Sequence, residues 1–396
     1  TIGKVGNSIY AFVALERIGG IMAYDITDPT NVTYSNYINT RDFSAENGIG
    51  GDSGPEGLYF IPATQSVTGA ALLLCGCEIT GTMPVYQLVQ APGDLKGKLV
   101  ILHTNDTHGG DVAVKDSSIG TAGVAQLVKD YEAAGAEVLL VSAGDAIQGD
   151  PLVNLSEGSV SIEFMNLAKY DLMVPGNHEF DYGYDNLLKL ESMADFPFVS
   201  ANILDKNTKK PVFKDNLIFE TVIGKVGVFG LTTPETLTKA NPDNVAALSF
   251  LAGEEMYAVA QEEVNKLLSA GCKYIICVAH LGVDEESSPN RSLDVIENVK
   301  GIDLMIDGHS HSVIDGNEED KTILTSAGTK LSHVGAVIID SDSMESNLIS
   351  AKEYNKVDVA VNEIINAKAA EIDLQLSKKF AVNEVLLDGN REPGVR

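Results

Sequence analysis

Most of the histidines in this chain stand beside other residues of the types that bind metals, in five short segments. The segments are TNDTHG with Asp106 and His108, AGDAIQGD with Asp145, GNHEFD with Asn177, His178 and Asp181, AHLG with His280, and GHSH with His309 and His311. Carboxylates, imidazoles and an amide oxygen together suit zinc, manganese or iron better than calcium. Each segment alone is a weak signal, but the five together indicate a metal site.

Two ions account for these ligands better than one. With Asp145 as a bridging carboxylate, ions about 3.5–4 Å apart could share and deprotonate a water and hold both the attacking and the leaving oxygen of a phosphoryl group. His103 is expected in the core or behind the site because it lies inside an apolar run, and His333 has no ligand-type neighbours.

Each of the five segments directly follows an apolar run that is typical of a buried strand. These runs are KLVILH (98–103), EVLLVS (137–142), DLMVP (171–175), KYIICVA (273–279) and IDLMID (302–307). Since the carboxyl ends of strands in an open α/β sheet line one crevice, we expect the segments to meet there.

Further strands are expected at 196–201, 225–231, 322–326 and 334–340, and helices at 123–135 and 253–271. Strands that are apolar along their whole length are buried on both faces, which predicts a layered α/β domain over 97–345.

The remaining segments differ in pattern. Residues 1–93 alternate short β-rich runs with turns and contain a weak internal repeat, and they resemble the last blades of a YncE-like or LVIVD-type β-propeller, with a small irregular β domain as the alternative. Residues 353–380 have helical spacing and predict one linker helix. Residues 381–396 are interpreted as the start of a truncated C-terminal substrate-binding domain.

Charge and composition narrow the class of partner. The chain has 28 Lys and Arg against 56 Asp and Glu, a formal net charge of −28, which disfavours nucleic-acid duplexes and anionic lipid. Bound cations would give a phosphate substrate the local positive charge that the chain lacks.

No apolar run is long enough to span a membrane and no signal peptide opens the chain. The pairs Cys75/Cys77 and Cys272/Cys277 are interpreted as structural.

The five segments, in this order, resemble those of the calcineurin-like metallophosphoesterases, in the branch of 5′-nucleotidases and 2′,3′-cyclic nucleotide phosphodiesterases. The resemblance covers residues 97–345 and implies a four-layer α/β/β/α sandwich with two metals. It implies that Asp106 and His108 bind the first metal, that Asp145 bridges, and that the second metal is held by Asn177, His280 and His309. His311 stands where the family often has Gln or Asn as a further ligand of the first metal.

The resemblance also implies a mechanism and a substrate. His178, oriented by Asp181, would stabilise the transition state and assist the leaving oxygen while water activated by the metals attacks phosphorus. The substrate would be a nucleotide or another small phosphoester, and the protein would act outside a bacterial cell or on its surface. In the family, arginines of a later domain hold the phosphate. Arg396, or with less support Arg391, is the candidate here, and an ordinary terminal arginine is the alternative.

Two other functions stay open. One is thiosulfohydrolase chemistry, as in SoxB-like relatives. The other is a non-catalytic cell-surface binding module that uses the metal fold as a scaffold. A third possibility is a competent metal centre that turns over nucleotides poorly because the base-binding domain is missing.

Overall fold

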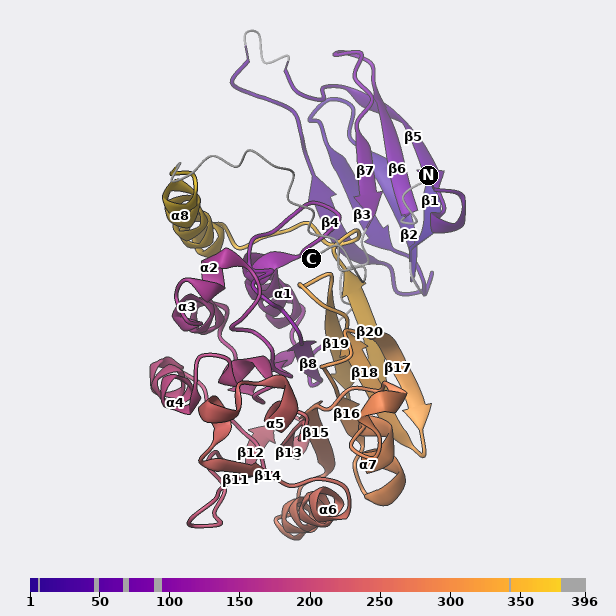
Figure 1. Cartoon of the computed structure of the whole chain (residues 1–396). Helices are drawn as coiled ribbons and strands as arrows, with labels where there is room; N and C mark the ends of the chain where they lie inside the picture. Colours follow the sequence, from indigo (N-terminus) through magenta and orange to yellow (C-terminus); the bar gives the residue numbers. More distant parts are fainter. Residues whose placement is uncertain (6–7, 46–49, 67–70, 89–94, 342, 379–396) are drawn as a thin grey trace.

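The computed structural model describes residues 1–5, 8–45, 50–66, 71–88, 95–341 and 343–378. It has a β-rich N-terminal part and a larger α/β part, and the β-rich part lies at the end of the molecule away from helix α6 (Figure 1). The predicted segment 381–396, Arg391 and Arg396 lie outside the described residues.

Two sheets form the centre of the α/β part. The five-stranded sheet has the order β10-β9-β8-β19-β20, with bounds Leu172–Met173, Glu137–Ser142, Leu99–Thr104, His333–Ile339 and Met344–Ser350. The six-stranded sheet has the order β12-β13-β15-β16-β18-β17, with bounds Asn216–Thr221, Gly224–Thr232, Tyr274–His280, Leu304–Ile306, Thr322–Ala327 and Val313–Glu319. The central strands β8, β9 and β10 are parallel to one another, as are β13, β15, β16 and β18.

Alternate residues of these strands face two different cores, because side chains along a strand point to opposite sides. In β8, Leu99 and Ile101 belong to the core between the two sheets, whereas Val100 and Leu102 face the helices outside. Both kinds of position are fully buried. This explains why the strand sequences are continuously apolar rather than alternating.

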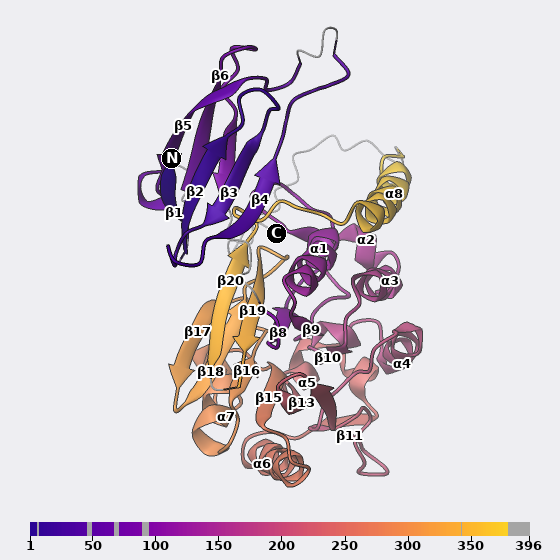
Figure 2. The ribbon, with the colours of Figure 1, turned by 180° about the vertical axis from the view of Figure 1, so that it is seen from behind.

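Helices cover the outer face of each sheet. Helices α1, α3, α4 and α8 lie on the side of the five-stranded sheet, and α6 and α7 pack on the six-stranded sheet (Figures 1 and 2). The helices are α1 (Gly120–Ala133), α2 (Pro151–Asn154), α3 (Ser159–Ala168), α4 (Tyr184–Met193), α5 (Thr236–Lys239), α6 (Glu254–Ser269), α7 (Ser292–Asn298) and α8 (Val359–Leu376). Short 3₁₀ turns are η2 (Ala63–Gln65), η3 (His178–Phe180), η4 (Pro242–Val245) and η5 (Glu285–Ser287). The predicted α/β/β/α layering is confirmed.

Several predicted elements differ from the structure. The run 196–201 forms no strand of the main sheets and makes only isolated bridges, Met173 with Phe198 and Val199 with Lys214. The run 171–175 gives a strand of two residues, β10. The helix predicted over 353–380 begins at Val359, because Asp358 caps it with hydrogen bonds from the backbone N–H groups of Ala360 and Val361, and it ends at Leu376.

The sequence patterns also missed several strands at sheet edges. These are β12, β17, β20 and the separate antiparallel pair β11 (Ile203–Asp205) and β14 (Leu248–Phe250). Edge strands carry polar residues on their open side, so they lack the continuous apolar signal of the central strands.

The N-terminal part consists of two antiparallel sheets that pack against each other. One has the order β1-β2-β3-β4 (Ile2–Val5, Ser8–Ala14, Ile21–Asp25, Thr33–Ile38) and the other β5-β6-β7 (Pro55–Ile61, Ala71–Cys77, Val85–Leu88). Their shared core includes Phe12, Ile21, Leu73 and Cys75. The resemblance to a propeller stays a prediction.

The four cysteines are buried and unpaired within the described residues. None of the helices described is long and apolar enough to cross a membrane.

Candidate metal centre

The predicted ligand residues follow the carboxyl ends of neighbouring strands in both sheets. Asp106 and His108 come after β8, Asp145 after β9, Asn177 after β10 and His309 and His311 after β16, while His280 is the last residue of β15. Five of them have the left-handed backbone that is uncommon outside glycine: Asp106 (φ 47°), His108 (φ 44°), Asp145 (φ 55°), His309 (φ 75°) and His311 (φ 53°). Such backbone strain gathers at functional sites, where it aims side chains at a common point.

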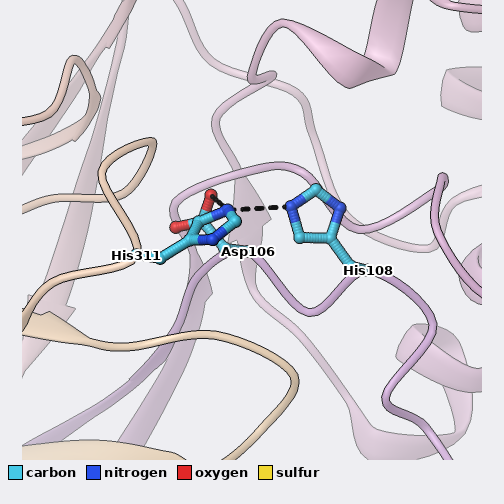
Figure 3. A group of neighbouring side chains, drawn as sticks. All are labelled: Asp106, His108 and His311. Carbon is cyan, nitrogen blue, oxygen red and sulfur yellow. Dashed lines mark hydrogen bonds and ion pairs between the residues drawn. The ribbon is translucent and has the colours of Figure 1, made fainter. Parts of the chain in front are cut away.

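Asp106, His108 and His311 form the first group of possible ligands (Figure 3). The Nε2 atoms of His108 and His311 lie 3.1 Å apart, and His311 Nε2 lies 3.5 Å from Asp106 Oδ1. One potential ligand atom from each residue lies within 4.8 Å of the others. Asp106 and His108 are buried, whereas the His311 side chain is 47% exposed, so this group is open to solvent on one side.

Asp145, His280 and His309 form the second group. His280 Nε2 lies 3.1 Å from Asp145 Oδ2. The same carboxylate oxygen lies 3.9 Å from His108 Nε2 in the first group. Asp145 therefore stands between the two groups, in the position that a bridging carboxylate requires.

Two buried polar atoms support a metal at the second group. Asn177 Oδ1 and His280 Nε2 are both buried and neither has a hydrogen-bond partner. The contact from His280 to Asp145 is short enough for an ion pair but lacks hydrogen-bond geometry. Buried polar atoms are rarely left unpaired, and an amide oxygen, imidazoles and a carboxylate together make a suitable donor set for a divalent cation. The residue after Asn177 contacts this group, because the backbone N–H of His178 donates to Asp145 Oδ1. The residues therefore fit two metal ions.

Backbone carbonyl groups orient two of the histidines. His108 Nδ1 lies 2.9 Å from the carbonyl oxygen of Gln148, and His280 Nδ1 lies 2.6 Å from that of Ala143. Each ring therefore donates through Nδ1 and keeps Nε2 for a ligand position.

The pKa values of the ligand side chains are shifted because several buried charges lie close together. Burial alone would lower the pKa of His280, but the carboxylates of Asp145 and Asp106 outweigh it and raise the pKa to about 10. Burial raises the pKa of Asp106 to about 7 even though the charge of His280 opposes the shift. Burial would also raise the pKa of Asp145, but His280 and its neighbours hold it below its ordinary value. Cations would stabilise these carboxylates in their charged form.

His178 and Asp181 form a pair at the edge of the two groups. His178 Nδ1 lies 2.7 Å from Asp181 Oδ2, and the ring of His178 lies 5.3 Å from that of His108 between centroids. Burial would lower the pKa of His178, but the hydrogen bond to Asp181 and the charge of Asp145 raise it. The backbone N–H of His178 donates to Asp145 Oδ1, and Asn244 donates to the carbonyl oxygen of Asp181, so both ends of this turn are held.

Glu179 was missed by the sequence analysis, although it lies inside the GNHEFD segment. Its side chain is completely buried and accepts hydrogen bonds from the backbone N–H groups of Asp145, Ala146 and Gly176, at 2.6–2.8 Å. Burial and the charge of Asp145 raise the pKa of Glu179 to about 7. Glu179 thus joins the loops that carry Asp145 and Asn177. No local pattern indicated this role, because Asp145 and Ala146 lie 34 and 33 positions away in the sequence.

The two remaining histidines lie outside both groups. His103 is fully buried and its Nε2 lies 3.2 Å from the hydroxyl of Thr325. Its ring fills the space over Gly335, where a Cβ would lie 1.8 Å from His103 Nε2, and burial lowers the pKa of His103 to about 3. His333 is the first residue of β19, and its Nδ1 lies 3.1 Å from the hydroxyl of Ser332. The expectation that neither is a ligand agrees with these positions.

Comparisons with known proteins match this architecture. The family model described as "Calcineurin-like phosphoesterase" matches residues 99–313, more than half of the chain. A 5′-nucleotidase of Vibrio cholerae is 30% identical over 354 residues, which cover 82% of this chain and 61% of that protein. The protein UshA of Salmonella pullorum is 30% identical over 335 residues, covering 83% of this chain and 60% of that protein. The chain thus spans about three fifths of the length of these relatives.

Solved structures show the same fold. The calcineurin-like phosphoesterase YfkN from Bacillus subtilis superposes with a TM-score of 0.62 at 24% identity, covering 71% of this chain and 99% of that one. The thiohydrolase SoxB of Thermus thermophilus superposes with a TM-score of 0.62 at 18% identity, covering 72% of this chain and 62% of that one.

Proposed function

Because the chain belongs to the calcineurin-like phosphoesterase family, we propose that it hydrolyses phosphate esters of nucleotides at a centre of two divalent metal ions. The observation that carries this proposal is the position of Asp145 Oδ2, 3.1 Å from His280 Nε2 and 3.9 Å from His108 Nε2. A carboxylate between two sets of nitrogen and oxygen ligands is the arrangement that a two-metal hydrolase needs.

The proposed ligands divide between the ions as the geometry groups them. The first ion is assigned to Asp106, His108 and His311, the second to Asn177, His280 and His309, and Asp145 to both. When bound, the ions would supply the positive charge that draws a phosphate to this acidic chain and activates water for attack on phosphorus. Zinc, manganese and iron are the candidate metals.

His178 is assigned the role of general acid. Its Nδ1 is engaged by Asp181 at 2.7 Å, which leaves Nε2 for the substrate. The raised pKa, which results from Asp181 and Asp145 acting against burial, favours the imidazolium form. A protonated Nε2 can stabilise negative charge on the phosphoryl group and give its proton to the leaving oxygen.

A 5′-nucleotidase or 2′,3′-cyclic nucleotide phosphodiesterase activity is the specific form of this proposal. The names of the relatives support nucleoside monophosphates as the first substrates to test. Thiosulfohydrolase chemistry is supported only by the fold similarity to SoxB, at 18% identity. A purely structural binding module would not require the buried, unpaired Asn177 and His280 atoms. Action outside the cytoplasm or at the cell surface belongs to the same proposal, and cell fractionation would test it.

Hydrolysis assays with the metal-loaded chain test the function. We expect cleavage of bis-p-nitrophenyl phosphate that is lost in His178→Ala, together with cleavage of AMP or 2′,3′-cyclic AMP. Cleavage of the simple diester without the nucleotides would show that nucleotide specificity requires residues outside this chain. Metal-loaded wild type that cleaves no phosphoester but releases sulfate from a thiosulfate conjugate would replace the proposal with the thiosulfohydrolase. Bound metal with no turnover of any of these substrates would favour the binding module.

A further inference from the structure

A carboxylate from a loop outside the five ligand segments contacts one histidine of the second group. Glu235 Oε2 lies 3.1 Å from His309 Nε2. Glu235 directly precedes helix α5 in the TTPET segment after β13, whereas His309 follows β16. The side chains of His309 and Glu235 are only 11% and 20% exposed, so the contact is largely shielded from water.

Among the candidate ligands, His309 differs in this respect from His108 and His280. His108 and His280 each face a neutral backbone carbonyl oxygen through Nδ1. His309 faces a charged side chain, and does so through Nε2. The nitrogen of His309 that is available to a metal is therefore Nδ1, the opposite of the nitrogen presented by His280.

Glu235 is itself held in place. Its backbone N–H donates to the hydroxyl of Thr233 at 3.3 Å, and Lys239, one helical turn later, lies 3.6 Å from Oε2. On the other side, the backbone N–H of His309 donates to the carboxylate of Asp106 at 3.0 Å. The His309 ring is thus fixed from its backbone and from its outer nitrogen.

We propose that Glu235 is a positioning residue of the second metal site, which accepts the Nε2 proton of His309 and thereby keeps Nδ1 unprotonated for the metal. This inference rests on the proposed function. A carboxylate behind a ligating imidazole fixes its tautomer and raises its basicity, and removal of such a partner commonly costs 10–100-fold in metal affinity.

Zn²⁺ titration of the metal-stripped chain against a chromophoric chelator tests the effect of Glu235 on metal affinity. We expect two Zn²⁺ ions in the wild type, one of which binds about 10–100-fold more weakly in Glu235→Ala. Glu235→Gln should lose less Zn²⁺ affinity, since the amide oxygen of Gln can still accept a hydrogen bond from His309 Nε2. The matched control is Glu262→Ala, because Glu262 also pairs with a lysine four residues later, Lys266 at 2.9 Å, whereas Glu235 pairs in addition with the candidate ligand His309.

The tautomer of His309 in the metal-free chain is a second readout, independent of turnover. Long-range ¹H–¹⁵N spectra should show His309 protonated on Nε2 in the wild type and in Glu235→Gln, and a mixture of tautomers in Glu235→Ala. Two unweakened Zn²⁺ sites with an unchanged tautomer in Glu235→Ala would overturn the inference. A wild type that binds no Zn²⁺ would instead contradict the proposed function, so the two failures are distinguishable.

Discussion

The Nε2 atoms of His108 and His311 lie 3.1 Å apart, although the two residues are separated by 203 positions in the sequence. His108 donates through Nδ1 to the carbonyl oxygen of Gln148. In a neutral ring, Nε2 of His108 therefore carries a lone pair, which is directed at the imidazole of His311. Two facing lone pairs would repel each other unless a proton or a cation lies near both nitrogens. The pair is therefore satisfied either by a proton that His311 donates from Nε2 or by a metal ion bound to both nitrogens.

Substitution of His311 should weaken the first metal site selectively. We expect His311→Ala to reduce the affinity for one of the two Zn²⁺ ions by at least about tenfold, because an imidazole ligand is lost. His311→Gln should retain most of that affinity, since its amide oxygen can replace the nitrogen. Chelator competition measures both variants. Equal affinities in wild type and His311→Ala would remove His311 from the site.

Substitution of His178 should affect turnover but not metal content. We expect His178→Ala to lower kcat for bis-p-nitrophenyl phosphate by about 10²–10⁴-fold, the usual contribution of a general acid. Asp181→Asn should cause a smaller loss, because the ring stays in place but its imidazolium form is less stabilised. Steady-state kinetics with elemental analysis of the same samples provide the measurement. Loss of metal in His178→Ala would show that the residue acts as a ligand.

Glu179 should matter for stability even in the metal-free chain. Glu179→Ala leaves the buried N–H groups of Asp145, Ala146 and Gly176 without their acceptor. Each unpaired buried group lowers the free energy of unfolding by about 1–3 kcal/mol. We therefore expect a large drop in the urea midpoint, with Glu179→Gln intermediate. A midpoint for Glu179→Ala within experimental error of the wild type would show that water replaces the carboxylate at no cost.

The N-terminal cap of helix α8 should make part of the stability depend on pH. The hydrogen bond from Lys129 and those from the helix N-terminus hold the pKa of Asp358 below its ordinary value of 3.8. Folding thus favours the carboxylate, and this stabilisation is complete above pH 3.8 and is lost as the pH falls through the lower folded value.

Replacing Asp358 provides the test. Asp358→Ala should cost about 0.5–2 kcal/mol at neutral pH, as loss of a helix cap does, and the difference from wild type should shrink in acid. Urea unfolding at neutral and acidic pH, followed by circular dichroism, measures it. A difference that stays constant down to the lowest pH would exclude the ionised cap as its source.

The sequence predicted those parts of the fold and site that depend on local patterns. The central strands were found because both faces are buried, as Leu99 and Val100 illustrate, and the candidate ligands could be proposed because each follows such a strand. Several edge strands were missed because their burial is partial, and the strand predicted at 171–175 is only two residues long in the structure, as β10. Glu179 and Glu235 were missed because their role depends on contacts across the fold, 33 to 74 positions away, which no local spacing reveals.

The most direct test of the two-metal centre is a titration of the metal-stripped chain with Zn²⁺ or Mn²⁺, in which bound metal and bis-p-nitrophenyl phosphate hydrolysis are recorded on the same samples. We predict two ions per chain, with hydrolysis appearing as the second site fills, and with binding at both sites weakened in Asp145→Ala because Asp145 lies between them. Binding of one ion or none, or hydrolysis that does not depend on added metal, would contradict the account.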